Sequence, residues 1–459
     1  MLEQFEYDEQ LEQLQQLLEE RKFSQLRNLL IELNPADIAT LFADIEEKDL
    51  PLLYRMLPKE LAAEVFAYMD NDMQEHLIRT FSDKELKEVL DNLFLDDMVD
   101  LVEEMPANVV SRILRSADSS TRKMINEILK YPEDSAGSLM TIEYVYFPKD
   151  ITVHEAIGRL RKVGVDKETI YTCYITQNRH LLGLVTVKDL LLAHDDTVLE
   201  DIMETNVIYA DAYDDKEKVA NLFSKYDFMA LPVVDKEQRL VGIITVDDAM
   251  DVMQEEATED IEKMAAITPT DKSYMHTGVI ETWLKRIPWL LILSVSATFT
   301  GMIISSFEES LARFVVLTAF IPMLMDTAGN CGSQASVTLI RALSLGDVEF
   351  RDLPRIVWKE GRVAILCGLA LSVTNFAKIM LVDRLLLGNT DVTVTVALVI
   401  CLTLFVTVIL AKIVGCVLPM LAKRIGFDPA VMASPFITAT VDALALLVYF
   451  RMAATLLGL

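Results

Sequence analysis

Long apolar stretches divide this chain into two parts. About 20 apolar residues are needed for a helix to cross a hydrocarbon core of ~30 Å. From Ile287 onward five stretches reach or approach that length, and they cover 287–306, 314–340, 363–382, 392–411 and 429–450. The pattern therefore predicts five transmembrane helices in the second part of the chain, preceded by a long part without any such stretch.

The basic residues around these stretches predict their orientation. If the first part lies in the cytosol, the cytosolic ends hold Lys285, Arg286, Arg341, Arg351, Arg355, Lys359, Arg362, Lys423 and Arg424, and the opposite ends hold only Arg313, Arg384 and Arg451. Cytosolic loops carry the excess of Lys and Arg. The start, MLEQFEYDEQLEQ, has neither a basic nor an apolar region, so we expect no signal peptide. A multi-pass protein of the cell (inner/plasma) membrane is expected, with its N-terminus in the cytosol and its C-terminus outside.

Residues 10–130 have a helical pattern, because apolar residues recur at steps of three and four. Short breaks such as LNPAD, MLPKE and EMPAN interrupt the pattern. Each places a proline just before an acidic or polar residue, as helix starts do. Residues 1–130 are therefore expected to form an acidic N-domain of short helices stacked in a superhelix.

An internal repeat follows. The segment CYITQNRHLLGLVTVKDLL (173–191) matches LPVVDKEQRLVGIITVDDAM (231–250), with Gly183 aligned to Gly242. Each copy predicts a strand, a turn, a second strand and a helix that starts at Thr-x-x-Asp. The pattern resembles the cystathionine-β-synthase (CBS) domain, which occurs in tandem pairs, so an α/β CBS pair is expected at 131–200 and 201–252.

The residues after the repeat predict a helix over 246–276 that joins the pair to the membrane part. Asp248, Asp251, Glu255 and Glu259 fall on one stripe of this helix, and Glu256 and Asp260 flank it. One interpretation is a solvated helix face. The other is a divalent-cation sensor, because like charges at this spacing repel and oxygen-bound cations relieve that repulsion.

Charge separates the two parts and excludes one class of function. Residues 283–459 hold 14 Lys+Arg and 11 Asp+Glu, so 28 of the 42 basic and 59 of the 70 acidic residues lie in 1–282. The first part therefore has a net charge of about −31 and the second about +3. Nucleic-acid binding depends on Lys and Arg that neutralise phosphates, so no nucleic-acid partner is expected. The five cysteines form no CxxC pair and are expected to be small core residues.

Asp442 is the candidate ion ligand of the membrane part, because it lies near the centre of the last apolar stretch. A charge at that depth costs at least ~2.5–3.5 kcal/mol. Either it lines an ion path, or it is buried in an ion pair with Lys412 or hydrogen-bonded between helices. The second stretch contains PMLMDTAGNCGSQAS, where Gly329 and Gly332 permit close backbone approach. Asp326 in the same stretch fits either a path or an ion pair.

The whole chain resembles the MgtE family of bacterial magnesium channels. The matching features are the domain order and the segments FDPAVMASPFITATVDALA, AGNCGSQ and EEATED. The resemblance implies a homodimer in the lipid bilayer, with one path in which Asp442 faces hydrated Mg²⁺. It also implies that cytosolic Mg²⁺ closes the path by binding between the N-domain, the CBS pair and a connecting "plug" helix, here 253–282, before the transmembrane domain at 283–459.

The implied regulatory metal ligands are carboxylates. They are Glu64, Asp96 and Asp100 in the N-domain, Asp215, Glu217 and Asp227 in the CBS pair, and Asp248, Asp251, Glu255, Glu256, Glu259 and Asp260 on the connecting helix. A member of the family binds ATP at its CBS pair, which makes Tyr171, Asp189 and Phe228 the candidate residues for ATP as a regulatory ligand. Thr186, Asp189, Thr245 and Asp248 also fit a simpler role as helix caps.

The expected fold class is thus a multi-domain, mainly α membrane protein, with a helical N-domain, a CBS pair, a connecting helix and five spans. The expected function is Mg²⁺ import under feedback control, and not an enzyme, since no nucleophile–base or hydrolytic metal constellation is present. An ion-coupled secondary carrier for Mg²⁺, Mn²⁺ or Co²⁺ with a nucleotide-sensing CBS module is the alternative. A chloride channel with CBS domains would need anion-binding helix starts in many more spans.

Overall fold

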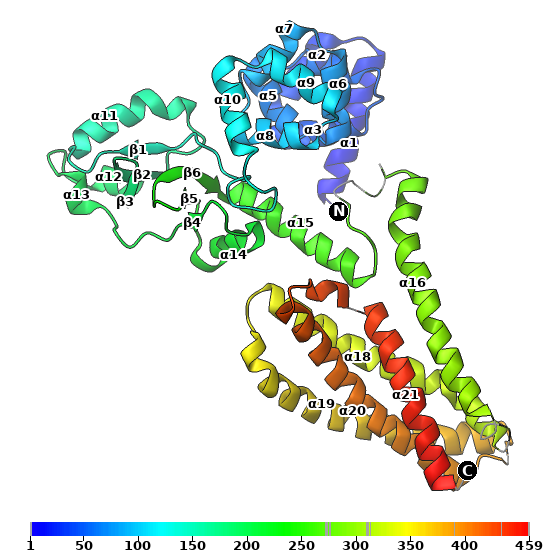
Figure 1. Ribbon diagram of the computed structural model, residues 1–459. Coiled ribbons are helices and arrows are strands. Elements are labelled where there is room, and N and C mark those ends of the chain that lie inside the picture. The colour runs from blue at the N-terminus through cyan, green and yellow to red at the C-terminus, as the bar shows by residue number, and fades with distance from the viewer. Residues whose placement is uncertain are drawn as a thin grey trace. The chain divides into compact units, whose positions relative to one another are not determined.

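The computed structural model describes residues 2–270, 274, 277–308, 312, 314–389, 391–432 and 434–457. The chain divides into two compact units, Met1–Met253 and Gln254–Leu459. The first holds a group of short helices and two small sheets, and the second holds the long apolar helices (Figure 1). The expected class of fold is confirmed.

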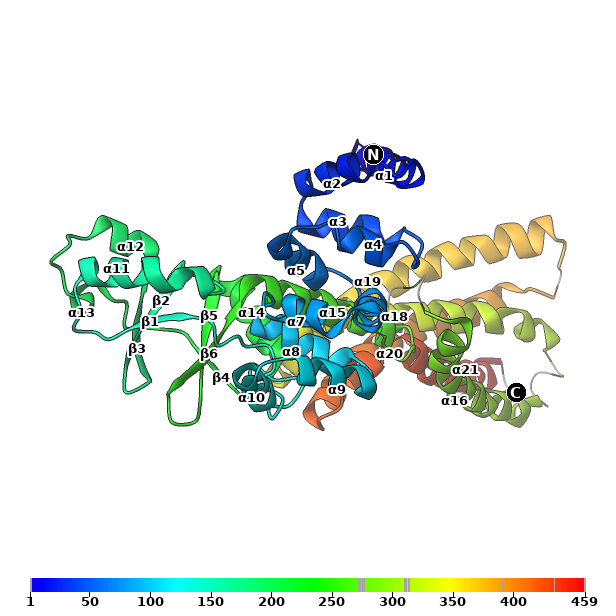
Figure 2. The ribbon, with the colours of Figure 1, turned by 90° about the horizontal axis from the view of Figure 1, so that it is seen from above.

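The first part of the chain forms short stacked helices. They are α1 (Leu2–Glu19), α2 (Phe23–Glu32), α3 (Pro35–Ala43), α4 (Leu50–Tyr54), α5 (Lys59–Ala67), α6 (Asn71–Thr80), α7 (Asp83–Leu90), α8 (Leu95–Glu104), α9 (Ala107–Ser116) and α10 (Ser119–Ile128). Helix α3 packs against α5, α5 against α7 and α7 against α9, so alternate helices form a column (Figure 2). Pro35 is the first residue of α3, and Pro58 and Pro106 directly precede α5 and α9, because proline fits a helix start.

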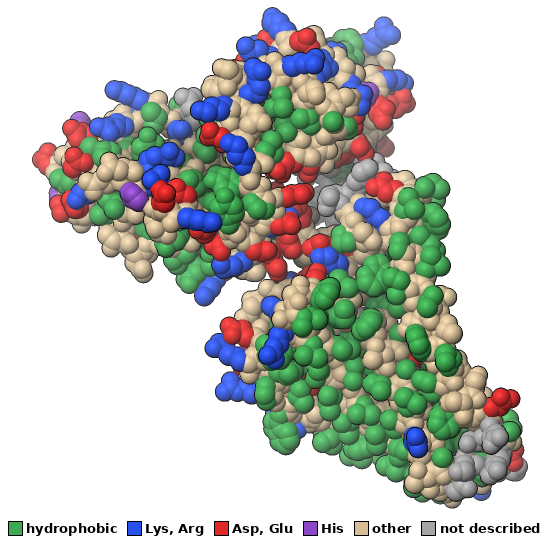
Figure 3. Space-filling view, viewed as in Figure 1, with side chains coloured by type: hydrophobic (Ala, Val, Ile, Leu, Met, Phe, Trp, Pro, Cys, Tyr) green, Lys and Arg blue, Asp and Glu red, His purple; other side chains and the backbone are tan. Residues whose placement is uncertain are grey.

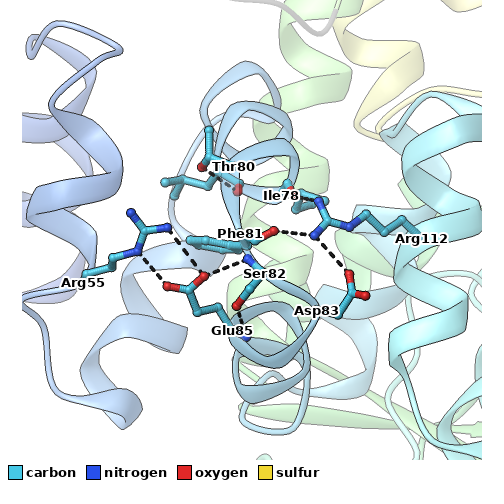
Figure 4. Close-up of polar contacts among 9 residues, drawn as sticks. Arg55, Ile78, Thr80, Phe81, Ser82, Asp83, Glu85 and Arg112 are labelled. Atoms are coloured by element: carbon cyan, nitrogen blue, oxygen red, sulfur yellow. Dashed lines mark hydrogen bonds and ion pairs between the residues drawn. The ribbon is translucent and has the colours of Figure 1, made fainter.

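Two arginines hold the junction between α6 and α7 (Figure 4). Arg55 pairs with Glu85, with 2.7 Å between Nε and Oε1. Arg112 of α9 donates to the carbonyl oxygens of Ile78, in the last turn of α6, and of Phe81, the residue after that helix, and pairs with Asp83. The carboxylates at this junction therefore have permanent basic partners.

Each copy of the repeat forms the two predicted strands and the helix after them, and an additional strand completes each of two three-stranded sheets. Their strands are β1 (Val145–Phe147), β2 (Thr172–Gln177) and β3 (His180–Thr186) in the first, and β4 (Ala210–Asp211), β5 (Ala230–Val234) and β6 (Leu240–Thr245) in the second. In each sheet the first pair of strands is parallel and the second antiparallel. The remaining helical elements of this region are α11 (Val153–Val163), η1 (Gly164–Asp166), α12 (Val187–Leu192), α13 (Leu199–Ile202) and α14 (Lys216–Tyr226).

The aligned glycines of the repeat lie where another segment crosses the outer strand. A Cβ on Gly183 would lie 2.7 Å from the Glu204 carbonyl oxygen, and one on Gly242 would lie 2.8 Å from that of Thr141. Both crossing segments pair with the strand, Thr141 with Ile243 and Glu204 with Leu184. Thr141 precedes the first sheet in the chain but pairs with the second, whereas Glu204 follows the first sheet and pairs with it.

The connecting helix α15 (Val246–Met264) is shorter than the predicted 246–276. Ala266 has a left-handed backbone with φ of 55°, and the Ile267 amide donates to the Glu262 carbonyl. These are the features of a helix-terminating Schellman motif, and Pro269 follows. Residues 271–273, 275 and 276 of the predicted helix lie outside the described residues.

Five membrane-length helical segments confirm the predicted spans, and each is longer than its apolar stretch. They consist of α16 (Val279–Ser306), η2 (Val315–Phe320) with α18 (Ile321–Ser344), η3 (Phe350–Asp352) with α19 (Leu353–Lys378) and the π-helical η4 (Ile379–Leu386), α20 (Val394–Arg424), and η5 (Pro429–Met432) with α21 (Ser434–Leu457). Helices α18, α20 and α21 pack on one another, α19 packs on α20, and α16 packs on α21. Gly415 contacts the Gly332 backbone, so α18 and α20 cross as closely as helices can.

Candidate ion path and divalent-cation sensor

Asp442 lies on α21 where that helix faces α18. Its Oδ1 is buried and accepts no hydrogen bond from the residues that the structure describes. A Cβ on Gly329 would lie 3.6 Å from this oxygen and 2.9 Å from Thr438 Cγ2, so glycine brings α18 close to the carboxylate. Pro435 lies in the first turn of α21, whereas Pro429, which the sequence placed in the same helix, belongs to η5.

A polar face runs along α18 near Asp442. Asp326, Asn330 and Gln334 follow one another at four-residue steps and are all exposed in the single chain. Asp326 lies close enough to Asp442 for the two charges to interact. Carboxylate and amide groups in a membrane span avoid lipid and line water-filled paths or protein contacts.

Lys412 does not pair with Asp442, which removes the ion-pair alternative for that carboxylate. The Lys412 side chain is 6% exposed, and its Nζ lies 3.6 Å from Oε2 of Glu360 on α19. The pair ties α20 to α19.

The soluble unit contains an acidic cluster, defined here as Asp96, Asp97, Asp100, Glu143, Glu168, Asp247 and Asp248, whose charges act on one another. It joins helix α8, the segments before β1 and β2, and the start of α15. Acidic side chains gather over α15 in Figure 3. Asp96, Asp100 and Asp248 were candidates from the sequence, and the structure brings them together.

The cluster raises the pKa of its members. Burial, aided by neighbouring carboxylates, raises the pKa of Asp96 to about 7 and that of Asp248 to about 7. Asp100 keeps contact with solvent, yet burial and the charges of Asp248 and Asp96 raise its pKa to about 8. The same causes raise the pKa of Glu168 to about 9. These carboxylates therefore repel one another when they ionise.

Sequence reasoning missed four members of the cluster. Asp97 and Asp247 each adjoin a candidate and could have been included on that ground. Glu143 and Glu168 lie in loops without a motif, and a hydrogen bond from the Glu168 amide to the Glu143 carbonyl (3.0 Å) joins their chain segments. What distinguishes Glu143 and Glu168 is burial next to another carboxylate, and no local sequence pattern encodes that.

Four other candidates lie outside the acidic cluster. Glu64 is an exposed residue of α5. Asp215 caps α14 by accepting a hydrogen bond from the Lys218 amide, and Asp227 ends that helix with a left-handed backbone. Glu217 lies in the first turn of the same helix. For Asp215 and Asp227 the structure thus shows a role in shaping α14.

The remaining candidates follow α15 toward its end. Asp251 and Glu255 are exposed, Glu256 is half-buried, and burial raises the pKa of Asp251. Glu259 pairs with Lys263, and Asp260 accepts a hydrogen bond of 2.7 Å from Ser344 at the end of α18. Across all described residues, no three His, Cys, Asp or Glu side chains are close enough to hold a bare metal ion.

The nucleotide candidates lie around the first helix of the repeat. Tyr171 is 65% exposed, and its carbonyl oxygen accepts from the Val187 amide at the start of α12. Asp189 Oδ2 accepts from the amide and hydroxyl of Thr186, so it caps α12 as the simpler interpretation requires. Phe228, in the second repeat, stacks on Tyr226. An exposed ring beside an exposed carboxylate fits a nucleoside, because the base can stack and the ribose can donate to the carboxylate.

Family models match most of the chain. One described as a divalent cation transporter matches residues 321–452, one described as the MgtE intracellular N domain matches 33–134, and a CBS domain model matches 136–196 and 199–255. With the five membrane-length helices, these matches define a multi-pass membrane protein of the divalent-cation transporter class. The chain belongs to the MgtE family.

Individual relatives agree over nearly the full length. The chain is 36% identical to a magnesium transporter MgtE of Thermus thermophilus, with 88% of each chain covered, and 33% identical to one of Bacillus subtilis, with 88% and 90% covered. It is also similar to the crystal structure of the cytosolic domain of the Mg²⁺ channel MgtE in complex with ATP. That similarity has a TM-score of 0.50 at 37% identity and covers 52% of this chain and 98% of the other. A second structure, the soluble part of a magnesium transporter, gives a TM-score of 0.51 at 31% identity over 55% and 99% of the two chains.

Proposed function

We propose that this protein imports Mg²⁺ across the bacterial inner membrane along a path that passes Asp442 and the polar face of α18. The carrying observation is the buried Asp442 oxygen without a hydrogen-bond partner among the described residues. A hydrated divalent cation supplies both the counter-charge and the hydrogen-bond donors that this oxygen lacks. The relatives named as magnesium transporters support Mg²⁺ as the substrate.

The functional assembly is a homodimer, with the N-terminus in the cytosol and the C-terminus outside. The polar face formed by Asp326, Asn330 and Gln334 supports this assembly, because it is exposed in one chain yet lies in a membrane span. A second copy that presents the same face would enclose a polar path between two Asp442 residues. The basic cytosolic loops support the orientation.

Cytosolic Mg²⁺ closes this path by neutralising the acidic cluster. The raised pKa values support this role, because without cations ionised carboxylates there repel one another and destabilise the compact arrangement. Mg²⁺ bound through water relieves the repulsion and holds the first half of α15 in place. The other regulatory carboxylates proposed from the sequence contribute weaker sites to the same equilibrium. They are Glu64, Asp215, Glu217, Asp227, Asp251, Glu255, Glu256, Glu259 and Asp260. Moving that equilibrium from 1:99 to 99:1 takes about 5.5 kcal/mol, which several weak sites can share.

ATP is the second regulatory ligand, bound beside Tyr171, Asp189 and Phe228. The related cytosolic domain that was crystallised with ATP supports this assignment. Titration calorimetry should show binding to the soluble segment 1–270 that weakens in Asp189→Asn, which keeps an acceptor for Thr186 but loses the charge. Absence of heat with the wild type at millimolar ATP would remove ATP from the proposal.

The test of the main function is electrical recording from the purified protein in a lipid bilayer, with Mg²⁺ as the permeant divalent cation. Unitary Mg²⁺ currents that fall as cytosolic Mg²⁺ rises are expected. The alternative is an ion-coupled carrier, and the buried Lys412–Glu360 pair favours it, since carriers use paired charges in their spans. Mg²⁺ flux that is slow, without unitary currents and coupled to a second ion would replace the channel with that carrier.

A further inference from the structure

Lys263, in the last turn of α15, shares its ammonium between two carboxylates. Its Nζ lies 2.6 Å from Oε1 of Glu259 on the same helix and 2.6 Å from Oδ2 of Asp428, in the loop before α21. Only 22% of the Lys263 side chain is exposed. The other Asp428 oxygen, Oδ1, accepts from the Ala430 amide at 2.8 Å. A single side chain thus joins the end of α15 to the backbone that leads into α21.

Two further contacts surround this lysine. Met264 packs against Ile340 of α18 and Ala430 of η5. Asp260, one turn earlier, accepts the hydrogen bond from Ser344 at the end of α18. The last turns of α15 are therefore attached to the two helices that carry the polar face and Asp442, whereas Ala249 and Val252 in the first turns belong to the apolar core of the second CBS sheet.

The charges around Lys263 favour its ammonium form. Burial opposes the charge, but the hydrogen bonds to Asp428 and Glu259 outweigh burial and raise the pKa of Lys263. Without the ammonium, Glu259 and Asp428 would face each other as two carboxylates on a partly buried surface. Such an arrangement is unfavourable unless a cation enters.

We propose that Lys263 is a built-in cation that keeps the end of α15 attached to the loop before α21 whether or not Mg²⁺ is present. The inference rests on the proposed function and makes Lys263 a positioning residue for closure of the path. Mg²⁺ at the acidic cluster fixes the first turns of α15, and the Lys263 bridge transmits that position to α21. Because the ammonium is covalently part of the helix, this bridge forms without a divalent cation.

The first test is the Mg²⁺ dependence of closure in the full-length protein. Lys263→Met should raise the cytosolic Mg²⁺ concentration that closes half of the channels by about threefold to tenfold, because a partly buried charge pair is lost. Current at low Mg²⁺ should stay unchanged, since the path itself is intact. Lys263→Arg should close as the wild type does. Lys123→Met, which removes a lysine with a 78% exposed side chain in the N-domain, should have no effect.

A double-variant cycle assigns the effect to the bridge. Asp428→Asn keeps an acceptor for the Ala430 amide but loses the charge, so it should raise the half-closing concentration too. Adding it to Lys263→Met should give no further increase, because the bridge is already broken. Independent, additive effects would overturn the inference, as would equal effects of Lys263→Arg and Lys263→Met.

A second readout does not depend on transport. Hydrogen–deuterium exchange of the full-length protein in chelator should be faster over 256–268 and 426–432 in Lys263→Met than in the wild type. Unchanged exchange overturns the bridge even if conduction follows the proposed function. Faster exchange in a protein that carries no Mg²⁺ current would keep the bridge and refute the proposed function instead. Lys263→Gln replaces Lys263→Met if the latter does not fold.

Discussion

The acidic cluster and the α6–α7 junction lie in the same unit, yet their carboxylates have opposite surroundings. At the junction, Arg55 and the Ser82 amide lower the pKa of Glu85 to about 2. In the cluster, burial and neighbouring carboxylates raise the pKa of Asp96 to about 7. A carboxylate with an arginine stabilises the fold under all conditions, whereas one that faces other carboxylates stabilises it only when a cation or a proton is added.

Asp442 resembles the cluster and not the junction, since its nearby charge is another carboxylate, Asp326. Asp442 differs from the cluster in its position, because it lies on a membrane-spanning helix. We therefore expect variants at Asp442 to remove transport, variants in the cluster to shift regulation, and variants at the junction to alter stability alone.

The largest effect is expected for Asp442→Ala. Mg²⁺ uptake into vesicles should fall to background while the protein still inserts and folds, because loss of a charge favours the apolar phase. Asp391→Asn, which neutralises an exposed loop carboxylate, is the matched control and should transport normally. Normal uptake by Asp442→Ala would remove Asp442 from the path. Since Lys412 pairs with Glu360, Lys412→Met should not restore uptake to Asp442→Asn.

The next effect concerns the triple variant Asp96→Asn, Asp100→Asn, Asp248→Asn. It should conduct at low Mg²⁺ but need about tenfold more cytosolic Mg²⁺ to close, which corresponds to about 1.4 kcal/mol of lost coupling. Neutralising the stripe formed by Asp248, Asp251, Glu255 and Glu259 should shift closure in the same direction. Patch recording with stepped Mg²⁺ measures both. Closure at wild-type Mg²⁺ in both variants would leave the carboxylates as a solvated surface.

A smaller effect is expected from pH. The folded-state pKa values of Asp96, Asp100 and Asp248 exceed those of unfolded Asp, so the folded protein binds more protons between about pH 4 and pH 8. Stability should therefore fall as pH rises through this window. In chelator, segment 1–270 should gain at least about 1.4 kcal/mol in free energy of unfolding between pH 8 and pH 6, the equivalent of one pKa unit.

Mg²⁺ and the triple variant provide the controls for this pH dependence. Added Mg²⁺ or the triple substitution should each reduce the dependence of stability on pH, because both remove the repulsion between carboxylates that protonation relieves. Chemical denaturation at each pH measures the difference. A wild-type stability that is the same at pH 6 and pH 8 in chelator would contradict the raised pKa values.

The smallest effect is expected at the α6–α7 junction. Arg55→Met should lower the free energy of unfolding by about 0.2–1 kcal/mol, as partly exposed ion pairs do, and should leave the Mg²⁺ dependence of closure unchanged. Chemical denaturation and patch recording measure the two quantities. A shift in closure as large as that of the triple variant would show that the two regions do not differ as described.

The sequence predicted the features that depend on long or repeated patterns. Five spans follow from apolar length, and the two sheets follow from a repeat in which Gly183 and Gly242 align. The end of α15 was predicted 12 residues too late, because the helix is ended by Ala266, which adopts a left-handed backbone that alanine rarely takes. Glu143, Glu168 and the Lys263 bridge could not be predicted, since each depends on contacts between segments distant in the chain.

The crossing segments beside Gly183 and Gly242 make the two repeats inseparable. Residues 135–141 come before the first sheet, yet Ser135 pairs with Asp215 and Thr141 with Ile243, both in the second repeat. A chain cut at residue 200 would leave that segment without its partner and would expose the edge of β6. The pair should consequently unfold in a single transition, and neither copy can be deleted without removing a strand partner of the other.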